Sequence, residues 1–305
     1  MSEAPNTPWR ISVLEKLRGY AGKDSMVEFG DYCEEMKDRI RPTTYHTEII
    51  PTLDSLSAGF QQGEVIVLGG AQNEGKTLLT LSLIAAFAEQ ELVSAFFSFE
   101  QTPEQIAEKY KYAPPRFYMP RTLEAHTVYD PFIEKLKKRG ESFLGELPTS
   151  RLQWIYLKLM EMVANGRTPQ IVFIDFLHSL LGFGGDRVVW SIGGVMDALK
   201  KIALDLKVVI FAICHLNRDV KDGGEPSVYD LRESGWIENL ADVVLLLWRQ
   251  MDKRTGEPGV LSVLKIGKHR RKGNAKNRKI ELVMTDRGLL VEHADREDFN
   301  AAYSY

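Results

Sequence analysis

The chain has 305 residues, of which 44% are hydrophobic and 27% are charged, and its formal net charge is −3. This composition is typical of a globular protein with a sizeable core, and it excludes a strongly basic protein that binds nucleic acid over its whole surface. The two cysteines, Cys33 and Cys214, are too few for a disulfide framework, and no apolar run approaches the ~18 residues that span a bilayer. We therefore expect a cytoplasmic protein in a reducing compartment, without a membrane segment.

Residues 1–45 predict a helical segment distinct from the rest of the chain. Two amphipathic patterns, at 11–20 and 25–40, precede a break at Pro42. So short a pair cannot form its own core, and it is expected to dock either on the following domain or on a neighbouring subunit. At the other end, residues 295–305 are acidic and then polar-aromatic. They predict a frayed tail, with docking of a polymerase or single-strand-binding protein as the alternative.

Residues 46–294 predict an α/β domain with a mostly parallel central sheet and helices on both faces. Five apolar runs lack the alternation of a strand with one wet face, and helical patterns lie between them. The predicted strands are 65–68, 94–99, 171–174, 208–214 and 243–248, and the predicted helices are 78–89, 152–165 and 192–206. Residues 117–119 are a candidate extra strand, and residues 130–150 are expected to be a surface elaboration. Strands at 261–266, 279–284 and 289–292 predict a C-terminal antiparallel hairpin.

Residues 70–77, here called the phosphate loop, read Gly-Ala-Gln-Asn-Glu-Gly-Lys-Thr and fit the pattern G-x-x-x-x-G-K-[S/T]. Between a strand and a helix, such a loop turns backbone N–H groups toward a phosphate chain. Lys76 would reach the β- and γ-phosphates, and Thr77 would bind Mg²⁺. The alternative is a glycine-rich turn that matches by accident. The predicted ATP contacts are Gly70, Ala71, Gln72, Asn73, Glu74, Gly75, Lys76, Thr77 and Leu78. Glu74 either places a negative charge beside the phosphates or faces solvent.

Three other predicted strands are followed by a side chain that can bind a metal ion or transfer a proton, namely those of Glu100, Asp175 and His215. Ligands of open α/β sheets bind outside the carboxyl ends of the strands. Phosphoryl transfer to water needs an acid that holds Mg²⁺, a role that suits Asp175, and a group that orients the water, a role that suits Glu100. His215 either reports the γ-phosphate or caps its strand.

Several segments, in the right order over residues 52–291, resemble the ATPase domain of DnaB-type hexameric replicative helicases, in a minimal phage- or plasmid-like form. The most specific is Asp230-Leu231-Arg232-Glu233-Ser234-Gly235. The others are Thr52-Leu53-Asp54, Gly63-Glu64-Val65-Ile66-Val67-Leu68, Phe97-Ser98-Phe99-Glu100, Ile174-Asp175-Phe176-Leu177-His178 and Cys214-His215-Leu216-Asn217-Arg218.

This resemblance implies a RecA-like P-loop NTPase that forms a hexamer around single-stranded DNA, hydrolyses ATP with Mg²⁺ at subunit interfaces, and unwinds duplex DNA during replication. It implies that Glu100 is the catalytic acid and that His215 is the γ-phosphate sensor, where many relatives have Gln. It also implies that Lys268 and Arg270, with Arg271 as an alternative, enter the neighbouring subunit's site as a basic finger.

The finger belongs to a basic run, residues 265–279, with eight Lys or Arg and no acid. The run is either a solvated loop or, as we favour, a contact for triphosphate, DNA or both. DNA contacts in the family come from loops after the third and fourth strands. Here those loops are 181–187 and 218–224, in which Arg187, Arg218 and Lys221 are the predicted DNA-binding residues, the alternative being two flexible surface loops.

The helical domain with which DnaB proteins meet primase does not fit within 45 residues. Primase, polymerase and single-strand-binding protein therefore remain candidate partners only. One alternative function is a RecA-like DNA-dependent ATPase, recombinase- or loader-like, that binds DNA without unwinding it. Another is an ATPase of the circadian-clock or signalling type. The sequence does not select the preferred NTP, the translocation polarity or the source organism.

Overall fold

The computed structural model describes residues 15, 16, 18, 42–109, 116–120, 147, 150–181, 192–217, 224–232, 234–251 and 258–293. The chain divides into two units, Met1–Pro42 and Thr43–Tyr305. Apart from Glu15, Lys16 and Arg18, the helices predicted in the first unit lie outside the described residues, as does the predicted tail. Residues 44–45, predicted to belong to the N-terminal segment, form β1 (Thr44–Tyr45), which pairs with β2 (Phe60–Gln61) in the second unit.

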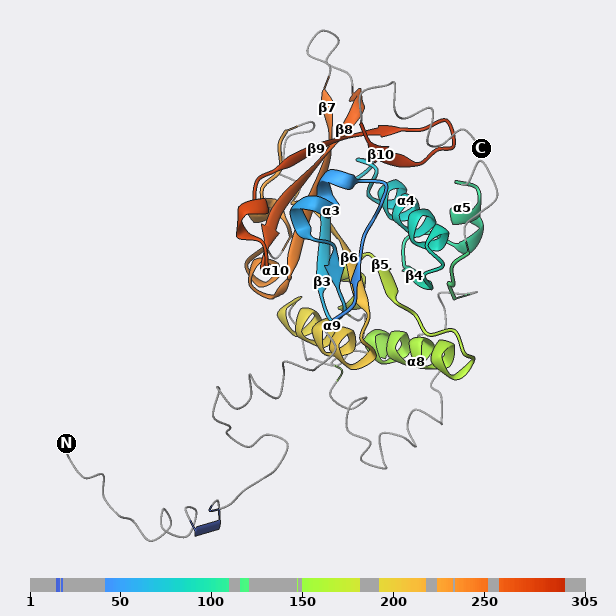
Figure 1. Ribbon diagram of the computed structural model, residues 1–305, viewed down its shortest axis with the longest axis vertical. Helices are drawn as coiled ribbons and strands as arrows, with labels where there is room; N and C mark the ends of the chain where they lie inside the picture. Colours follow the sequence, from blue (N-terminus) through green and yellow to red (C-terminus); the bar gives the residue numbers. More distant parts are fainter. Residues whose placement is uncertain are drawn as a thin grey trace, which may run out of the picture. The chain divides into compact units, whose positions relative to one another are not determined.

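The second unit is built on an eight-stranded sheet in the order β10-β9-β8-β7-β3-β6-β5-β4 (Figure 1). Its parallel part consists of β3 (Val65–Gly70), β4 (Ser94–Ser98), β5 (Ile171–Asp175), β6 (Val209–His215) and β7 (Val243–Met251). Strands β8 (Pro258–His269), β9 (Lys279–Met284) and β10 (Leu290–Glu292) extend it in antiparallel fashion. The predicted mostly parallel sheet and C-terminal hairpin are therefore confirmed.

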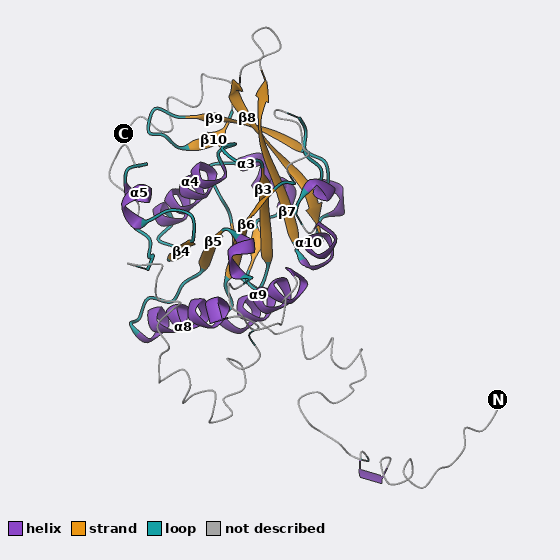
Figure 2. Ribbon diagram, turned by 180° about the vertical axis from the view of Figure 1, so that it is seen from behind, coloured by secondary structure: helices purple, strands orange, loops and turns teal. Residues whose placement is uncertain are grey.

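Helices cover both faces of this sheet (Figure 2). One face carries α3 (Pro51–Ser57), α4 (Lys76–Glu89) and α5 (Pro103–Ala107), and the other carries α8 (Ser150–Ala164), α9 (Ile192–Leu206) and α10 (Ser234–Leu240). The short helices η2 (Leu177–Leu180), η3 (Val228–Asp230) and η4 (Gly273–Ala275) lie in connections. Among the described helices, none is long and apolar enough to cross a bilayer.

The strand β3 shows why the central strands are continuous apolar runs. Val65 and Val67 pack into the core beneath α8 and α9, whereas Ile66 and Leu68 pack into the core beneath α4. Every side chain of such a strand is removed from water, so the alternation of a half-exposed strand is absent. This burial explains why the apolar runs located the strands.

Two predictions need correction. The candidate strand at 117–119 is a single parallel bridge between Tyr118 and Ala95, in which Tyr118 N donates to Ser94 O at 2.9 Å. The predicted surface elaboration 130–150 lies largely outside the described residues, but its Leu147 is buried in the core with α8 and α9.

Candidate nucleotide-binding site

The phosphate loop joins β3 to α4 and requires glycine at two places. At Gly70 an added Cβ would lie 2.6 Å from the backbone carbonyl of Leu247 on β7, closer than such atoms approach. Gly75 has φ +93 and is the N-cap of α4, a backbone conformation that side-chain-bearing residues rarely adopt. The helix therefore starts directly at the loop, with its first backbone N–H groups without partners inside the helix.

Lys76 is folded back over its own loop. Its Nζ donates to the carbonyl oxygen of Ala71 at 2.6 Å, and the side chain is buried. Burial lowers the pKa of the Lys76 ammonium, while the carboxylates of Asp175 and Glu100 oppose that shift. A buried cation beside the start of a helix favours an anion at this position.

Thr77 and Asp175 meet across the end of the sheet. Thr77 Oγ1 donates to Asp175 Oδ2 at 3.2 Å, and Asp175 is 1% exposed. Burial raises the pKa of Asp175, the charge of Glu100 adds to the rise, and the Thr77 hydrogen bond and Lys76 work against it.

These two side chains fit Mg²⁺ bound together with a nucleotide. A hydroxyl and a carboxylate oxygen are the hard donors that this ion prefers. Within the described residues no group of three or more His, Cys, Asp or Glu could hold a metal ion. Phosphate oxygens and water would therefore have to complete the coordination.

Glu100 and His215 form a pair beside this position. His215 Nε2 lies 2.9 Å from Glu100 Oε1, and both side chains are partly exposed. The ring of Phe176 packs edge-on against the His215 ring, with centroids 5.1 Å apart. The strands β3, β6, β5 and β4 are neighbours, and their carboxyl ends lie at one end of the sheet. Five predicted site residues gather at this carboxyl end, as expected for residues that come after parallel strands: Lys76, Thr77, His215, Asp175 and Glu100.

Lys268 and Arg270 lie toward the opposite end of the sheet, where the parallel strands begin. Arg270 N donates to Asp242 O, which places Arg270 level with Val65, five positions before Gly70. At about 3.3 Å per residue this is roughly 16 Å along the strand, too far for Arg270 to reach the phosphate loop of its own chain. The structure therefore does not bring the predicted finger together with the other predicted site residues.

Both finger candidates have partners at that end of the sheet. Lys268 Nζ donates to the carbonyl oxygens of Glu238 and Ala241, the latter at 2.6 Å, at the end of α10. Arg270 Nη1 donates to Asp242 Oδ1 at 3.2 Å, and Nη2 donates to Asn239 O at 2.8 Å. Burial lowers the pKa of Lys268, and Arg270 adds to that shift. The Arg270 side chain is nevertheless 49% exposed.

Asp242 is the centre of this group. Its Oδ2 accepts from Val65 N at 2.9 Å and from Lys200 Nζ at 2.7 Å, while its Oδ1 accepts from Arg270. Sequence reasoning missed this role, because its partners lie 28 to 177 residues away along the chain.

The basic run contains no acid of its own, but acids from other segments pair with three of its side chains. Glu225 binds Lys265 at 2.9 Å and Lys279 at 2.5 Å, and Glu64 binds Arg271 at 2.5 Å. These acids come from segments 40 to 207 residues away, so no local pattern contained them. Three basic side chains of the run are exposed without a partner among the described residues, namely those of Lys272, Lys276 and Arg278.

Glu74, at the tip of the phosphate loop, is held by the neighbouring strand. Its Oε2 accepts from Arg249 N on β7 at 2.6 Å, and the side chain is half-buried. The Glu74 carboxylate is therefore partly shielded from solvent by its contact with β7. The predicted DNA-binding residues Arg187, Arg218 and Lys221 lie outside the described residues.

A parallel sheet, a phosphate loop after β3 and acids after neighbouring strands define a P-loop protein of the nucleotide-binding α/β class. The family model described as "DnaB-like helicase C terminal domain" matches residues 46–287. The chain belongs to this family.

Curated relatives agree with this assignment. "Replicative DNA helicase DnaB" of Helicobacter pylori is 30% identical over 213 residues, which cover 66% of this chain and 44% of that protein. "Replicative DNA helicase DnaC" of Bacillus subtilis is 25% identical over 277 residues, covering 87% of this chain and 61% of that protein. The chain thus spans about half the length of the H. pylori relative.

Solved structures share the fold. One, titled "The Structure Of A DnaB-Like Replicative Helicase And Its Interactions With Primase", has a TM-score of 0.61 at 20% identity and covers 92% of this chain and 70% of its own. A second solved structure, described as an ATPase domain, has the same TM-score and identity and covers 87% of this chain and 97% of its own. The predicted RecA-like fold is therefore confirmed.

Proposed function

We propose that this chain is the ATP-driven motor of a ring-shaped replicative DNA helicase, which hydrolyses nucleotide at subunit interfaces and moves on single-stranded DNA to unwind duplex. The observation that carries the proposal is the placement of the predicted residues. One end of the sheet, where the parallel strands finish, carries the phosphate loop, Asp175, Glu100 and His215. The other end carries Arg270. Head-to-tail contacts between identical subunits join unlike surfaces, and they close into a ring where the rotation permits. The ring that we propose is a hexamer.

Nucleotide would enter at the phosphate loop. Lys76 would exchange the Ala71 carbonyl, 2.6 Å away, for the β- and γ-phosphate oxygens. Thr77 and Asp175, already joined by a hydrogen bond, would hold Mg²⁺ directly or through water. When bound, this ion would neutralise charge on the phosphates.

Glu100 would orient the attacking water, and His215 would contact the γ-phosphate. The side chains of Glu100 and His215 lie within hydrogen-bond distance of each other, at 2.9 Å. A γ-phosphate oxygen that takes the His215 hydrogen bond would release the Glu100 carboxylate to a water molecule. The Phe176 ring, packed on His215, would limit the positions that the imidazole can take.

Arg270, with Lys268 beside it, would reach the nucleotide of the neighbouring subunit. A guanidinium supplied in trans stabilises transition-state charge and makes hydrolysis depend on assembly. Arg270 is more exposed than Lys268, and Arg271 is tied to Glu64, so Arg270 is the best finger candidate.

Other parts of the proposal concern residues beyond those described. The N-terminal segment before β1 would dock either on the following domain or on a neighbouring subunit. Arg187, Arg218 and Lys221 would contact the DNA backbone, and residues 295–305 would remain a tail. The names of the curated relatives support DNA as substrate. The cytoplasm stays the proposed location. One related structure is described with primase, which makes primase a candidate partner.

The test is a helicase assay on purified protein. We expect ATP hydrolysis that is stimulated by single-stranded DNA, strand separation on a forked duplex, and a hexameric mass by native mass spectrometry. Lys76→Ala should abolish hydrolysis. DNA-stimulated hydrolysis without strand separation would instead identify the recombinase- or loader-like alternative, and an absence of stimulation would refute both.

A further inference from the structure

The two finger candidates, Lys268 and Arg270, flank a histidine that the proposed function does not use. His269 is the last residue of β8 and pairs with Val243 on β7. It is buried, at 5% exposed, whereas the side chain of Arg270, the next residue, is 49% exposed. A buried ring and an exposed guanidinium therefore belong to successive residues at the point where the chain leaves the strand.

His269 closes a bend of the backbone around Arg270. Its Nδ1 accepts from the backbone N–H of Lys272 at 3.2 Å, so one hydrogen bond spans Arg270 and Arg271. Arg271, in the same bend, donates from Nη2 to the carbonyl oxygen of Gly59 at 2.7 Å. These contacts tie the bend to its own chain and leave Arg270 as the more exposed of its two arginines.

The imidazole of His269 accepts this hydrogen bond only in its neutral form, because both nitrogens of the protonated ring are donors. Burial lowers the pKa of His269, and the charges of Arg271 and Lys272 add to that shift. The Glu64 carboxylate and the backbone of Ser57 oppose it. The ring is therefore neutral at pH 7, and its proton lies on Nε2.

That proton is poorly accommodated. Among the described residues, the buried Nε2 of His269 has no hydrogen-bond partner. A buried N–H without an acceptor destabilises the fold, and an apolar side chain of similar size avoids the penalty. Stability alone therefore does not favour a histidine at this position. The contact that an apolar side chain could not supply is the one from Nδ1 to the bend.

We propose that His269 is a positioning residue for the finger, which holds the bend so that Arg270 meets the triphosphate of the neighbouring subunit in one orientation. The inference rests on the proposed role of Arg270. A guanidinium binds phosphate oxygens through a planar fork, so its direction decides how well it stabilises charge in the transition state. A displacement of about 1 Å can reduce a rate by about 100-fold.

Three substitutions separate the hydrogen bond from the volume of the ring. His269→Asn keeps an acceptor near the position of Nδ1, His269→Gln places its amide nearer that of Nε2, and His269→Leu removes both polar atoms. We expect the DNA-stimulated kcat for ATP to fall about 10- to 100-fold in the Gln and Leu variants, with KM for ATP within about 2-fold of wild type. The Asn variant should keep kcat within about 3-fold. A space-filling role predicts the opposite order, because Asn is the smallest of the three side chains.

Mixing His269→Leu with Lys76→Ala tests whether the defect lies in the finger. The phosphate loop of a His269→Leu chain and the finger of a Lys76→Ala chain are both intact. Random assembly of equal amounts joins them at about one quarter of the interfaces of a head-to-tail ring, so we expect about a quarter of the wild-type rate. His293→Leu, at an exposed histidine, is the matched control and should leave kcat unchanged.

Equal kcat values in the three His269 variants would overturn the proposal, as would a mixture with Lys76→Ala that hydrolyses ATP no faster than His269→Leu alone. If His269→Leu does not fold, the Gln variant takes its place in the mixture and in the comparison with Asn. If Arg270→Ala is inactive while all His269 variants match wild type, only the positioning role is wrong. If Arg270→Ala hydrolyses ATP as fast as wild type, the finger of the proposed function is wrong as well.

Discussion

A mixture of two inactive variants, Lys76→Ala and Arg270→Ala, tests whether the finger acts on a neighbouring subunit. In one chain the two residues lie at opposite ends of β3. Arg270 is level with Val65, and the phosphate loop starts at Gly70, roughly 16 Å further along the strand at about 3.3 Å per residue. An arginine finger contributes about 10³- to 10⁵-fold to hydrolysis, so each variant alone should be nearly inactive.

Mixing should restore activity. An interface that joins the phosphate loop of an Arg270→Ala chain to the finger of a Lys76→Ala chain carries both intact residues. Random assembly of equal amounts places such pairs at about one quarter of the interfaces of a head-to-tail ring. We therefore expect about a quarter of the wild-type rate of phosphate release in the presence of single-stranded DNA.

Native mass spectrometry of tagged variants must first show that the rings are mixed. Each variant mixed with wild type is the control, and its activity should fall in proportion to the variant added. If mixed rings form but hydrolyse no faster than the separate variants, the finger is not supplied in trans by Arg270.

Three further predictions concern the described residues. Asp175→Asn should abolish hydrolysis yet raise the melting temperature by about 2–4 °C. Burial raises the pKa of Asp175, so the stability that its neutral form provides is lost as pH rises through that pKa, and the neutral amide avoids this loss. An unchanged or lower melting temperature at pH 7 would contradict this. Arg271→Ala should lower the free energy of unfolding, measured in urea, by about 3 kcal/mol, because it removes the ion-pair partner of the buried Glu64 carboxylate. Its control, Lys272→Ala at an exposed position, should change this free energy by less than about 0.5 kcal/mol. Equal effects would refute the role of the pair. Gly70→Ala should weaken binding of a fluorescent ATP analogue at least ~10-fold, because its Cβ would collide with a backbone carbonyl of β7, and unchanged affinity would show that the loop relaxes freely.

The parallel core and the phosphate-binding edge were predictable, because both depend on local patterns. Helix α9 has the bounds predicted for residues 192–206, since its apolar period is regular and buried. Glu100, Asp175 and His215 could be placed together because the carboxyl ends of parallel strands share an edge. Their chemical roles stay predictions.

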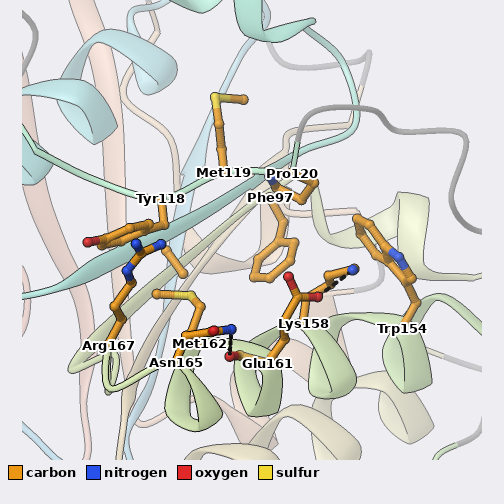
Figure 3. Close-up of a pocket in the computed structure, with 11 residues that line it drawn as sticks. Phe97, Tyr118, Met119, Pro120, Trp154, Lys158, Glu161, Met162, Asn165 and Arg167 are labelled. Carbon is orange, nitrogen blue, oxygen red and sulfur yellow. Dashed lines mark hydrogen bonds and ion pairs between the residues drawn. The ribbon is translucent and has the colours of Figure 1, made fainter.

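Contacts between distant segments were not predictable. The acids that pair with the basic run, and the contacts of Asp242, join positions whose proximity only the sheet order creates. Likewise, β8 extends to Pro258–His269 because β7 pairs with it beyond its apolar centre, residues 261–266. The cavity between β4, residues 118–120 and α8 (Figure 3) had no sequence signal, since its walls come from three separated stretches of the chain.

The carboxylate of Asp242 has a mechanical consequence. It fastens Arg270 to the first residue of β3, and the last residue of β3 opens the phosphate loop. A strand that is already extended and hydrogen-bonded on both sides cannot lengthen, and its buried side chains resist shear. A force on Arg270 is therefore transmitted along β3 to the phosphate loop with little change in the length of the strand.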